Sequence, residues 1–426
     1  MDKKTKALMA FLDEAHSVYH AAAYLAKTLE DAGYVRISEG EKWALQPGGK
    51  YYLTRGGTAV LAFRIPQGTP AGFLMSASHS DRPTFKVKEN AELCGTYTRL
   101  ATEKYGGMLM APWLDRPLSI AGRAMVETEN GVESRLVDID RDLLLIPNVA
   151  IHMNRSANDG FKWNPAVDML PLLGGKNAKG KLQKLLEKAA GGKILGHDLY
   201  LYIRQKAAIW GMDKEFLSAA ALDDLACAWC CTQGFLSAQE GGSIPVLCVF
   251  DSEEVGSSSL QGAASRLLQT TLSRICSALQ LDEQVMLANS FMVSADNGHA
   301  IHPNHPEYAD PSNAPVLGGG VVLKFNASQR YTTDGVTAAV FRKVCQKANV
   351  NVQTYCNRAD IPGGSTLGNI SLSQVSVPTV DIGLPQLAMH SCYETVAAQD
   401  ALDLESAMAA YYGSTLTVCG EQYTLS

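Results

Sequence analysis

The sequence has no apolar run of about 18 residues, the length that a helix needs to cross a bilayer. Its first residues are charged and lead into an amphipathic pattern, so we expect neither a signal peptide nor a membrane anchor. The sequence also lacks a large excess of charge of either sign. Its 37 basic and 43 acidic residues give a net charge of -6, and there is no long basic run. We therefore predict a cytoplasmic protein with no nucleic-acid and no membrane partner.

Cysteine pairs spaced for metal or redox chemistry are also scarce. The ten cysteines are scattered, and the CxxC of Cys227 and Cys230, with Cys231 beside it, lies on a helical pattern without a second pair nearby. Buried reduced thiols are the favoured interpretation, and a zinc knuckle or redox pair is the alternative. Internal repeats are absent too, and a composition that is 46% hydrophobic and 19% charged is that of an ordinary globular protein.

Three parts of the sequence differ in pattern, and the length of 426 residues favours two domains. Residues 1–89 predict a helix and then strands, residues 90–206 are β-rich with long loops, and residues 207–426 alternate strands with helices. This alternation predicts a mostly parallel α/β sheet, with the middle part as an inserted domain. Helices are expected at 8–29, 262–279 and 336–348, and strands at 50–52, 59–64, 72–77, 136–140, 143–146, 199–203, 246–250, 290–294 and 377–382. The lysine- and glycine-rich stretch 174–196 is expected to be a solvated loop.

Two adjacent glutamates, Glu253 and Glu254, follow the apolar run 244–250. Successive side chains at the end of a strand point in different directions. One carboxylate can therefore bind a metal while its neighbour faces the group that the metal activates. A metallohydrolase needs this division of labour.

Other metal-ligand candidates also lie where predicted strands end, the edge at which open α/β sheets place their functional crevice. The full candidate set of two histidines and three carboxylates is His79, Asp223, Glu254, Asp296 and His390. Such donors suit zinc, with cobalt or manganese possible, and three carboxylates plus a bridging hydroxide come close to neutralising two divalent ions. Asp81 is placed to accept the second ring N–H of His79.

Each candidate also has a structural alternative. Asp223 stands at a predicted helix start, where a carboxylate often serves as an N-cap. His79 could be a hydrogen-bonded structural histidine, Asp296 could cap a turn, and His390 could pack under a helix. The nearby His299, His302 and His305 are not assigned as ligands, because their spacing does not separate them from an ordinary polar loop.

The chain resembles the aspartyl aminopeptidase / aminopeptidase I family of dizinc metallopeptidases over almost its whole length. The order and spacing of many short blocks carry the resemblance. They are Glu41-Lys42-Trp43, residues 50–55, His79-Ser80-Asp81, Tyr105-Gly106-Gly107, residues 113–123, Val149-Ala150-Ile151-His152, residues 251–257, Ser294-Ala295-Asp296, residues 299–304, Gln329-Arg330-Tyr331, residues 363–368 and residues 385–391.

This resemblance implies a mostly parallel α/β zinc-peptidase domain, formed by residues 1–89 and 207–426, with an inserted β-rich dimerisation domain at 90–206. It implies that Asp223 bridges two metals, that His79 and Asp296 complete one site, and that Glu254 and His390 complete the other. Glu253 is then the general base for a metal-bridging water, and Asp81 steers His79. The family also implies a homo-oligomer, commonly a tetrahedral dodecamer built from dimers, in which His152 reaches a neighbour's active site to bind substrate.

Two departures from the family pattern, Arg82-Pro83 and Cys392-Tyr393-Glu394, leave the ligand set intact and bear on substrate preference. A preference for acidic N-terminal residues would need a cation, for which Lys324 is the first candidate by resemblance and Arg82 the second. Surface salt bridges are the alternative for both. We therefore predict a zinc-dependent metalloaminopeptidase acting on peptides, with N-terminal Asp or Glu as the candidate preference. The alternatives are a catalytically lapsed self-assembling peptide-binding scaffold and a dinuclear amidohydrolase with a non-peptide substrate.

Overall fold

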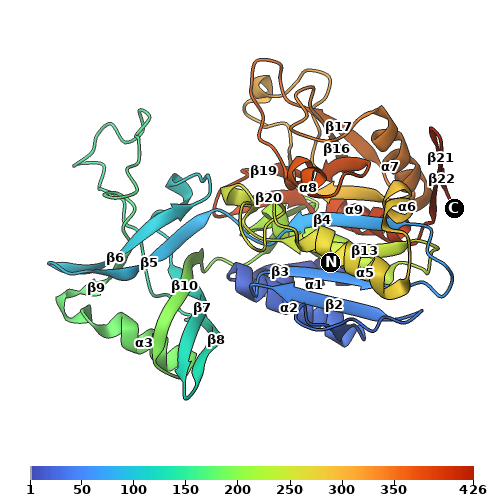
Figure 1. Cartoon of the computed structure of the whole chain (residues 1–426). Coiled ribbons are helices and arrows are strands. Elements are labelled where there is room, and N and C mark those ends of the chain that lie inside the picture. The colour runs from blue at the N-terminus through green and yellow to red at the C-terminus, as the bar shows by residue number, and fades with distance from the viewer. Residues whose placement is uncertain (1) are drawn as a thin grey trace.

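The computed structural model describes residues 2–426, and its largest element is a nine-stranded mixed sheet (Figure 1). In spatial order its strands are β1 (Val35–Arg36), β2 (Lys50–Arg55), β3 (Ala59–Arg64), β13 (Ile244–Phe250), β4 (Phe73–His79), β14 (Phe291–Ala295), β18 (Thr379–Gly383), β16 (Val321–Phe325) and β17 (Val352–Cys356). The central strands β13, β4, β14 and β18 pair in parallel, whereas β3 and β16 flank them in antiparallel orientation. The predicted mostly parallel α/β sheet is confirmed, with its antiparallel pairs outside the centre.

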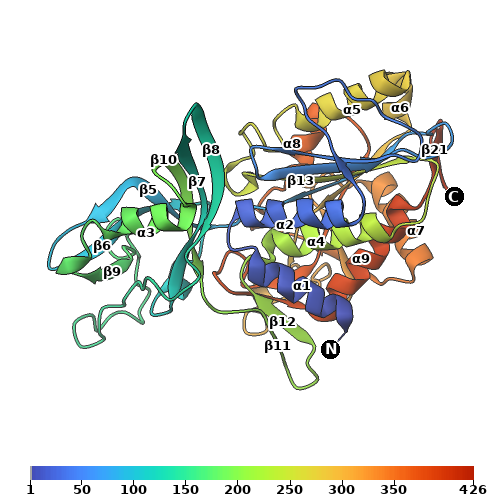
Figure 2. The same cartoon turned by 90° about the horizontal axis from the view of Figure 1, so that it is seen from below.

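Helices cover both faces of this sheet (Figure 2). On one face are α1 (Lys3–Glu14), α2 (Val18–Asp31), α4 (Leu222–Ser237), α7 (Gly335–Ala348) and α9 (Ala398–Tyr412), and on the other are α5 (Leu267–Leu279), α6 (Glu283–Ala288) and α8 (Leu367–Gln374). Each face has its own apolar core, so β4 and β13 are buried along their whole length. This double burial explains why their sequences are continuous apolar runs.

The single helix predicted at 8–29 is wrong, because α1 ends at Glu14 and α2 begins at Val18. Ser17 stands between them in an extended conformation, and its hydroxyl accepts the backbone N–H of His20. A serine that caps a new helix in this way interrupts the helix, although the apolar periodicity continues on both sides of it.

A second sheet is antiparallel and lies beside the first (Figure 1). Its strands are β8 (Gly131–Asp138), β7 (Leu118–Thr128), β10 (Ile194–Ile203), β5 (Thr84–Leu93), β6 (Tyr97–Tyr105) and β9 (Leu172–Gly175). It has a separate core that includes Phe85, Trp113 and Leu199. The strand predicted at 143–146 forms only isolated bridges. The division into domains at 89 and 207 stays a prediction, and because β5 begins at Thr84 we propose that the first boundary lies before that residue.

The loop expected at 174–196 is wrong, because this segment contains α3 (Lys181–Ala190). Leu182, Leu186 and Ala190 lie on one side of the helix and are buried, while the lysines between them are exposed. The apolar positions have the four-residue spacing of a helix face, which the high lysine and glycine content obscured.

A third, small sheet adjoins the carboxyl ends of the central strands. It consists of β11 (Ala208–Trp210), β12 (Phe216–Ala219), β20 (Glu394–Ala397), β19 (Pro385–Leu387) and β15 (Gly298–His299). The remaining elements are the hairpin β21 (Leu416–Cys419) and β22 (Gln422–Leu425) and the 3-10 turns η1 (Ala111–Trp113), η2 (Lys176–Ala178), η3 (Glu253–Val255) and η4 (Pro306–Tyr308).

The cysteines of α4 and the length of the helices bear on two expectations from the sequence, for the described residues 2–426. Cys227, Cys230 and Cys231 on α4 are buried and unbridged, which confirms the interpretation as buried thiols. Within the same residues, no helix is both long enough and apolar enough to pass through a bilayer.

Candidate metal centre

The central strands bring three of the candidate segments to one edge of the sheet. His79 is the last residue of β4, Glu253 and Glu254 follow β13 in η3, and Asp296 follows β14 directly. Because β13, β4 and β14 are parallel neighbours, their carboxyl ends meet at the same edge. In the structure these residues therefore lie at the carboxyl ends of the central strands, where the sequence predicted them.

Asp223 and His390 reach this edge from irregular backbone. Asp223 lies in the first turn of α4 but has extended dihedrals, φ -85° and ψ 108°, that turn it out of the helix. His390 lies after β19 in the left-handed region, with φ 65°. Neither residue is therefore held by the regular hydrogen bonds of a helix or strand.

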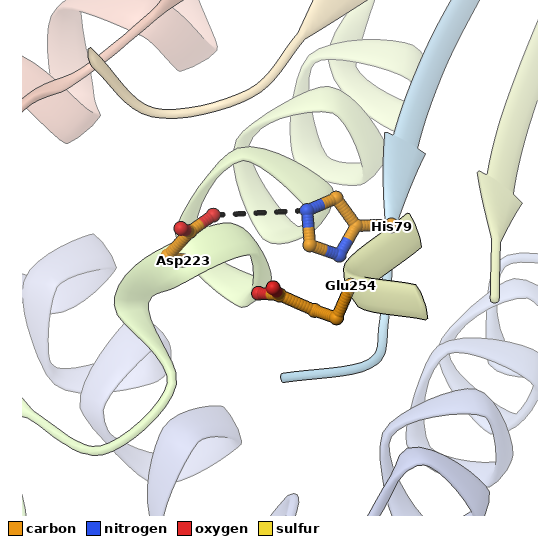
Figure 3. Close-up of side chains that lie close together, drawn as sticks. All are labelled: His79, Asp223 and Glu254. Atoms are coloured by element: carbon orange, nitrogen blue, oxygen red, sulfur yellow. Dashed lines mark ion pairs between the residues drawn. The ribbon is translucent and has the colours of Figure 1, made fainter. Parts of the chain in front are cut away.

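Three side chains, those of His79, His390 and Glu254, converge around the Asp223 carboxylate, and Figure 3 shows Asp223 with His79 and Glu254. Oδ1 of Asp223 lies 3.7 Å from Nε2 of His79, and its Oδ2 lies 3.3 Å from Nε2 of His390. The same His390 nitrogen is 3.5 Å from Oε2 of Glu254. Asp223 thus stands between the two histidines with one oxygen turned to each.

Two groups of potential ligand atoms share Asp223. One consists of His79, Asp223 and Glu254, and the other of Asp223, Asp224 and Asp296; within each group the atoms lie within 4.8 Å of one another. Two neighbouring cation sites with a common carboxylate are therefore possible in this geometry.

Three buried carboxylate oxygens in these groups have no hydrogen-bond partner: Oδ1 of Asp223, Oδ1 of Asp224 and Oε1 of Glu254. A buried polar atom without a partner is costly, and a buried carboxylate more so. Cations bound at the two groups would give these oxygens partners, and a set of imidazole and carboxylate donors is one that zinc accepts. The residues present therefore fit divalent metal ions.

The charges of the cluster lead to the same conclusion. Burial, together with the Asp223 charge, raises the pKa of Glu254 well above its usual range, and burial raises the pKa of Asp296 to about 6. Although burial opposes it, the hydrogen bond from His390 and the charge of His79 lower the pKa of Asp223. The chain alone leaves negative charge poorly compensated here, and divalent cations reverse that balance.

Asp81 connects His79 to the two glutamates. Nδ1 of His79 lies 3.2 Å from the carbonyl oxygen of Asp81 and 3.3 Å from its carboxylate, which leaves Nε2 facing Asp223. The same carboxylate accepts the backbone N–H groups of Glu253 and Glu254, each at 3.1 Å. Asp81 therefore sets the orientation of a histidine and of both glutamates.

The second sheet also contributes to this site. The Tyr105 hydroxyl donates to Oδ2 of Asp81 at 2.8 Å. Gly106 has φ +76°, and a Cβ at this position would come within 3.1 Å of Cβ of Glu254. Only glycine combines this conformation with so close an approach.

Glu253 has the environment of a proton-transfer group. The pKa of its carboxyl is raised to about 7, mainly by burial; the charges of Asp296 and Asp223 contribute to this rise, and His79 opposes it. A carboxyl group with a pKa near neutrality can both accept and release a proton at physiological pH.

Sequence reasoning missed two acidic residues. Oδ2 of Asp224 accepts the backbone N–H of His79 at 3.1 Å. The carboxylate of Glu394 accepts the backbone N–H groups of Asp223, at 3.0 Å, and of His390, at 2.7 Å. The adjacent pair Asp223-Asp224 repeats the pattern of the two glutamates and could have been a signal, whereas the role of Glu394 depends on tertiary contacts.

The cations considered for substrate preference lie in different places. Lys324 is 1% exposed, its Nζ donates to the carbonyl oxygen of Asp296 at 2.7 Å, and it lies 3.8 Å from the Asp296 carboxylate. The alternative of a surface salt bridge is therefore wrong for Lys324. Arg82 instead donates to the carbonyl oxygen of Ala15 at 2.6 Å and lines a cavity of about 380 Å³ that is bounded by the end of α1, the second sheet and the third sheet.

The other expected histidines lie outside the cluster. His152 is exposed in the long connection between β8 and β9, which extends away from the nine-stranded sheet at the upper left of Figure 1. His299, His302 and His305 line a separate cavity of about 320 Å³, and none belongs to the two ligand groups.

Comparisons with known proteins show the family of this chain. A family model described as aminopeptidase I zinc metalloprotease (M18) matches residues 11–412. A probable M18 family aminopeptidase 2 of Clostridium novyi is 40% identical over an alignment of 409 residues, which covers 92% of this chain and 94% of that protein. The cryo-EM structure of the Ape4 and Nbr1 complex has a TM-score of 0.93 and 34% identity, covering 96% of this chain and 85% of that chain. The mApe1 dodecamer of S. cerevisiae has a TM-score of 0.85 and 26% identity, covering 96% of both chains. This chain therefore belongs to the aminopeptidase I (M18) family of zinc metalloproteases and is an aminopeptidase of that family.

Proposed function

We propose that this protein removes single residues from the N-termini of peptides at a centre for two divalent ions, of which the donor set favours zinc. The observation that carries the proposal is the position of Asp223, which belongs to two ligand groups at once and has a buried oxygen without a hydrogen-bond partner. A single structural cation would not need a shared carboxylate.

The ligands divide into two sets around Asp223. His79 and Asp296 would hold one ion, and Glu254 and His390 would hold the other, with Asp223 common to both. Two bound ions would lower the pKa of a water molecule and polarise the peptide carbonyl. The position of Asp223 between the two imidazoles supports its shared role. The division itself is carried over from the family resemblance, because the ligand groups of the structure place His79 with Glu254 and Asp296 with Asp224.

Glu253 would carry the proton in the reaction. Its carboxylate accepts a proton from the attacking water and returns it to the leaving amine, so that the peptide bond breaks and the carboxylate is regenerated. Asp81 keeps Glu253 in place through the backbone N–H of that residue. Glu254, held through its own N–H by the same carboxylate, is left free to bind metal.

Preference for an acidic N-terminal residue is a further part of the proposal. Lys324 is buried beside Asp296, and although burial opposes it, Asp296 raises the pKa of Lys324 and keeps it charged. We propose that this charge, rather than Arg82, favours Asp or Glu at the substrate N-terminus. A profile over aminoacyl substrates decides the point, because equal turnover of Leu and Asp would remove the acidic assignment.

Assembly into a dodecamer built from dimers is proposed as well. The solved dodecamer of mApe1 and the exposed loop that contains His152 support it. In such an assembly His152 would reach a neighbouring subunit's site. Mass measurement in solution tests the assembly. We expect the H152A variant to assemble like wild type, because this residue would act on substrate and not on association.

Metal analysis combined with peptide turnover tests the main proposal. We expect two divalent ions per chain and release of free N-terminal amino acids from dipeptides. Metal-free protein that still binds peptides would favour the lapsed scaffold. Bound metal with hydrolysis of amides but not of dipeptides would favour an amidohydrolase.

A further inference from the structure

Glu394, at the start of β20, is a buried carboxylate with both oxygens occupied. The residue is 1% exposed. Its Oε2 accepts the backbone N–H of Asp223 at 3.0 Å, and its Oε1 accepts the backbone N–H of His390 at 2.7 Å. Because both oxygens are used in this way, Glu394 acts on the centre through these two residues rather than as a ligand.

The two segments that Glu394 joins have irregular backbone, although other hydrogen bonds also hold them, such as the one from the Leu109 N–H to the carbonyl oxygen of His390 at 3.0 Å. Asp223 has dihedrals outside the helix in which it lies, and the preceding Ala221 is in the left-handed region with φ 57°. His390 is also left-handed, with φ 65°. Non-glycine residues hold such conformations only where their surroundings impose them. A carboxylate that accepts one amide from each segment supplies that constraint.

We infer that Glu394 is a positioning residue that sets the spacing between the Asp223 carboxylate and the His390 imidazole. The 3.3 Å between Oδ2 of Asp223 and Nε2 of His390 is the distance that it maintains. This inference rests on the proposed function, because it takes both residues as metal ligands. Loss of the constraint would therefore weaken metal binding before it disturbed the fold.

The surroundings of Glu394 favour variants that still fold. Glu394 lines the cavity of about 380 Å³ beside the second and third sheets, together with Arg82 and Ser391. Water in this cavity can approach the amide groups that a substitution leaves without an acceptor, which reduces the cost of the change.

The chain contains a matched control in Asp400, in the first turn of α9. This carboxylate is also fully buried and also accepts two backbone N–H groups, those of Gly318 and Gly320, each at 2.8 Å. It differs from Glu394 in that neither amide belongs to a candidate ligand. D400N therefore reports the cost of disturbing a buried, doubly bonded carboxylate without touching the metal centre.

The experiment compares wild type, E394Q and D400N after replacement of the metal by Co²⁺. Gln keeps the shape of Glu and one acceptor oxygen, but turns an NH₂ group toward the second amide. The readouts are the visible absorption spectrum of bound Co²⁺, its dissociation constant by chelator competition, and kcat and KM on a dipeptide.

We expect E394Q to bind Co²⁺ about 10–100-fold more weakly with an altered spectrum, the usual effect of losing a group that orients a ligand. We expect D400N to retain wild-type affinity and spectrum. Wild-type binding by E394Q, or an equal loss in D400N, would overturn the inference. If wild type itself bound no Co²⁺, the metal centre of the proposed function would fail instead.

Discussion

Asp81 lies within 3.3 Å of Nδ1 of His79, and this contact leaves the other ring nitrogen of His79 directed at Asp223. A histidine that binds metal through one nitrogen commonly has the other held by a carboxylate or carbonyl group. Here Asp81 offers both groups to the same nitrogen.

Replacement of Asp81 should weaken the metal centre without removing a ligand. We expect D81N to lower metal affinity and kcat/KM by about 10–100-fold, because Asn keeps only one acceptor oxygen and turns an NH₂ group toward the groups that the other oxygen held. Chelator competition and steady-state kinetics measure the effect. D138N is the matched control, since Asp138 contacts His16 at 2.6 Å in a second His–Asp pair outside the centre. Equal effects in both variants would contradict the assignment.

Substitutions of the two adjacent glutamates, Glu253 and Glu254, should have different effects on metal binding and on turnover. We expect E253Q to bind metal like wild type but to lose about 10²–10⁴-fold in kcat, because the amide cannot accept the proton. We expect E254Q to lose metal as well as activity. Metal content by elemental analysis, together with kcat, distinguishes the two variants. Near wild-type turnover by a fully metallated E253Q would remove Glu253 from the role of general base.

The contact between α1–α2 and the second sheet should make stability depend on pH. Although burial opposes it, the hydrogen bond from His16 lowers the pKa of Asp138 to about 2. A carboxyl group with a depressed folded-state pKa stabilises the protein above its unfolded pKa, about 3.9, and this stability is lost as the pH falls toward 2. The contribution is at most about 2–3 kcal/mol, and solvent screening reduces it because Asp138 is partly exposed.

Thermal unfolding of wild type and D138N at several pH values measures this contribution. We expect wild type to have the higher Tm at pH 7. The difference in Tm between wild type and D138N should shrink as the pH is lowered from about 4 toward 2. A difference in Tm that stayed constant over this range would show that the ionised form of Asp138 is not what stabilises the contact.

Helix α3 should contribute to the stability of the second sheet. Leu186 is 2% exposed and belongs to the core of that sheet. We expect L186A to lower the free energy of unfolding by about 2–5 kcal/mol, through lost burial and the cavity left behind. K188A, on the exposed side of the same helix, should change it by less than about 0.5 kcal/mol. Denaturant unfolding compares the two, and equal effects would mean that α3 is not packed as described.

Much of the site follows from local sequence pattern. The strands β4, β13 and β14 are short apolar runs that end in polar residues, and parallel pairing brings such ends to one edge. His79, Glu254 and Asp296 could therefore be expected close together from the sequence. Asp223 and His390 are different, because their backbone is irregular and no periodicity predicts where it points.

Helix α3 and the break at Ser17 show why some local elements were not predicted. In α3 a high content of lysine and glycine concealed an apolar face of three residues. At Ser17 the apolar periodicity continues through a capping residue, so the pattern alone gives one long helix. In both segments a few residues with a specific local role outweigh the average composition.

The sequence by itself determined which donors stand at the ends of the central strands, and hence the metal-binding chemistry that this edge supports. The reason is that apolar runs specify buried strands, and the residues that follow them must emerge at the sheet edge. Only the tertiary structure decided that Glu394 joins Asp223 to His390 and that Lys324 is buried beside Asp296. Those relationships are contacts between segments far apart in the chain, and a one-dimensional pattern contains no information about which distant amide a carboxylate will accept.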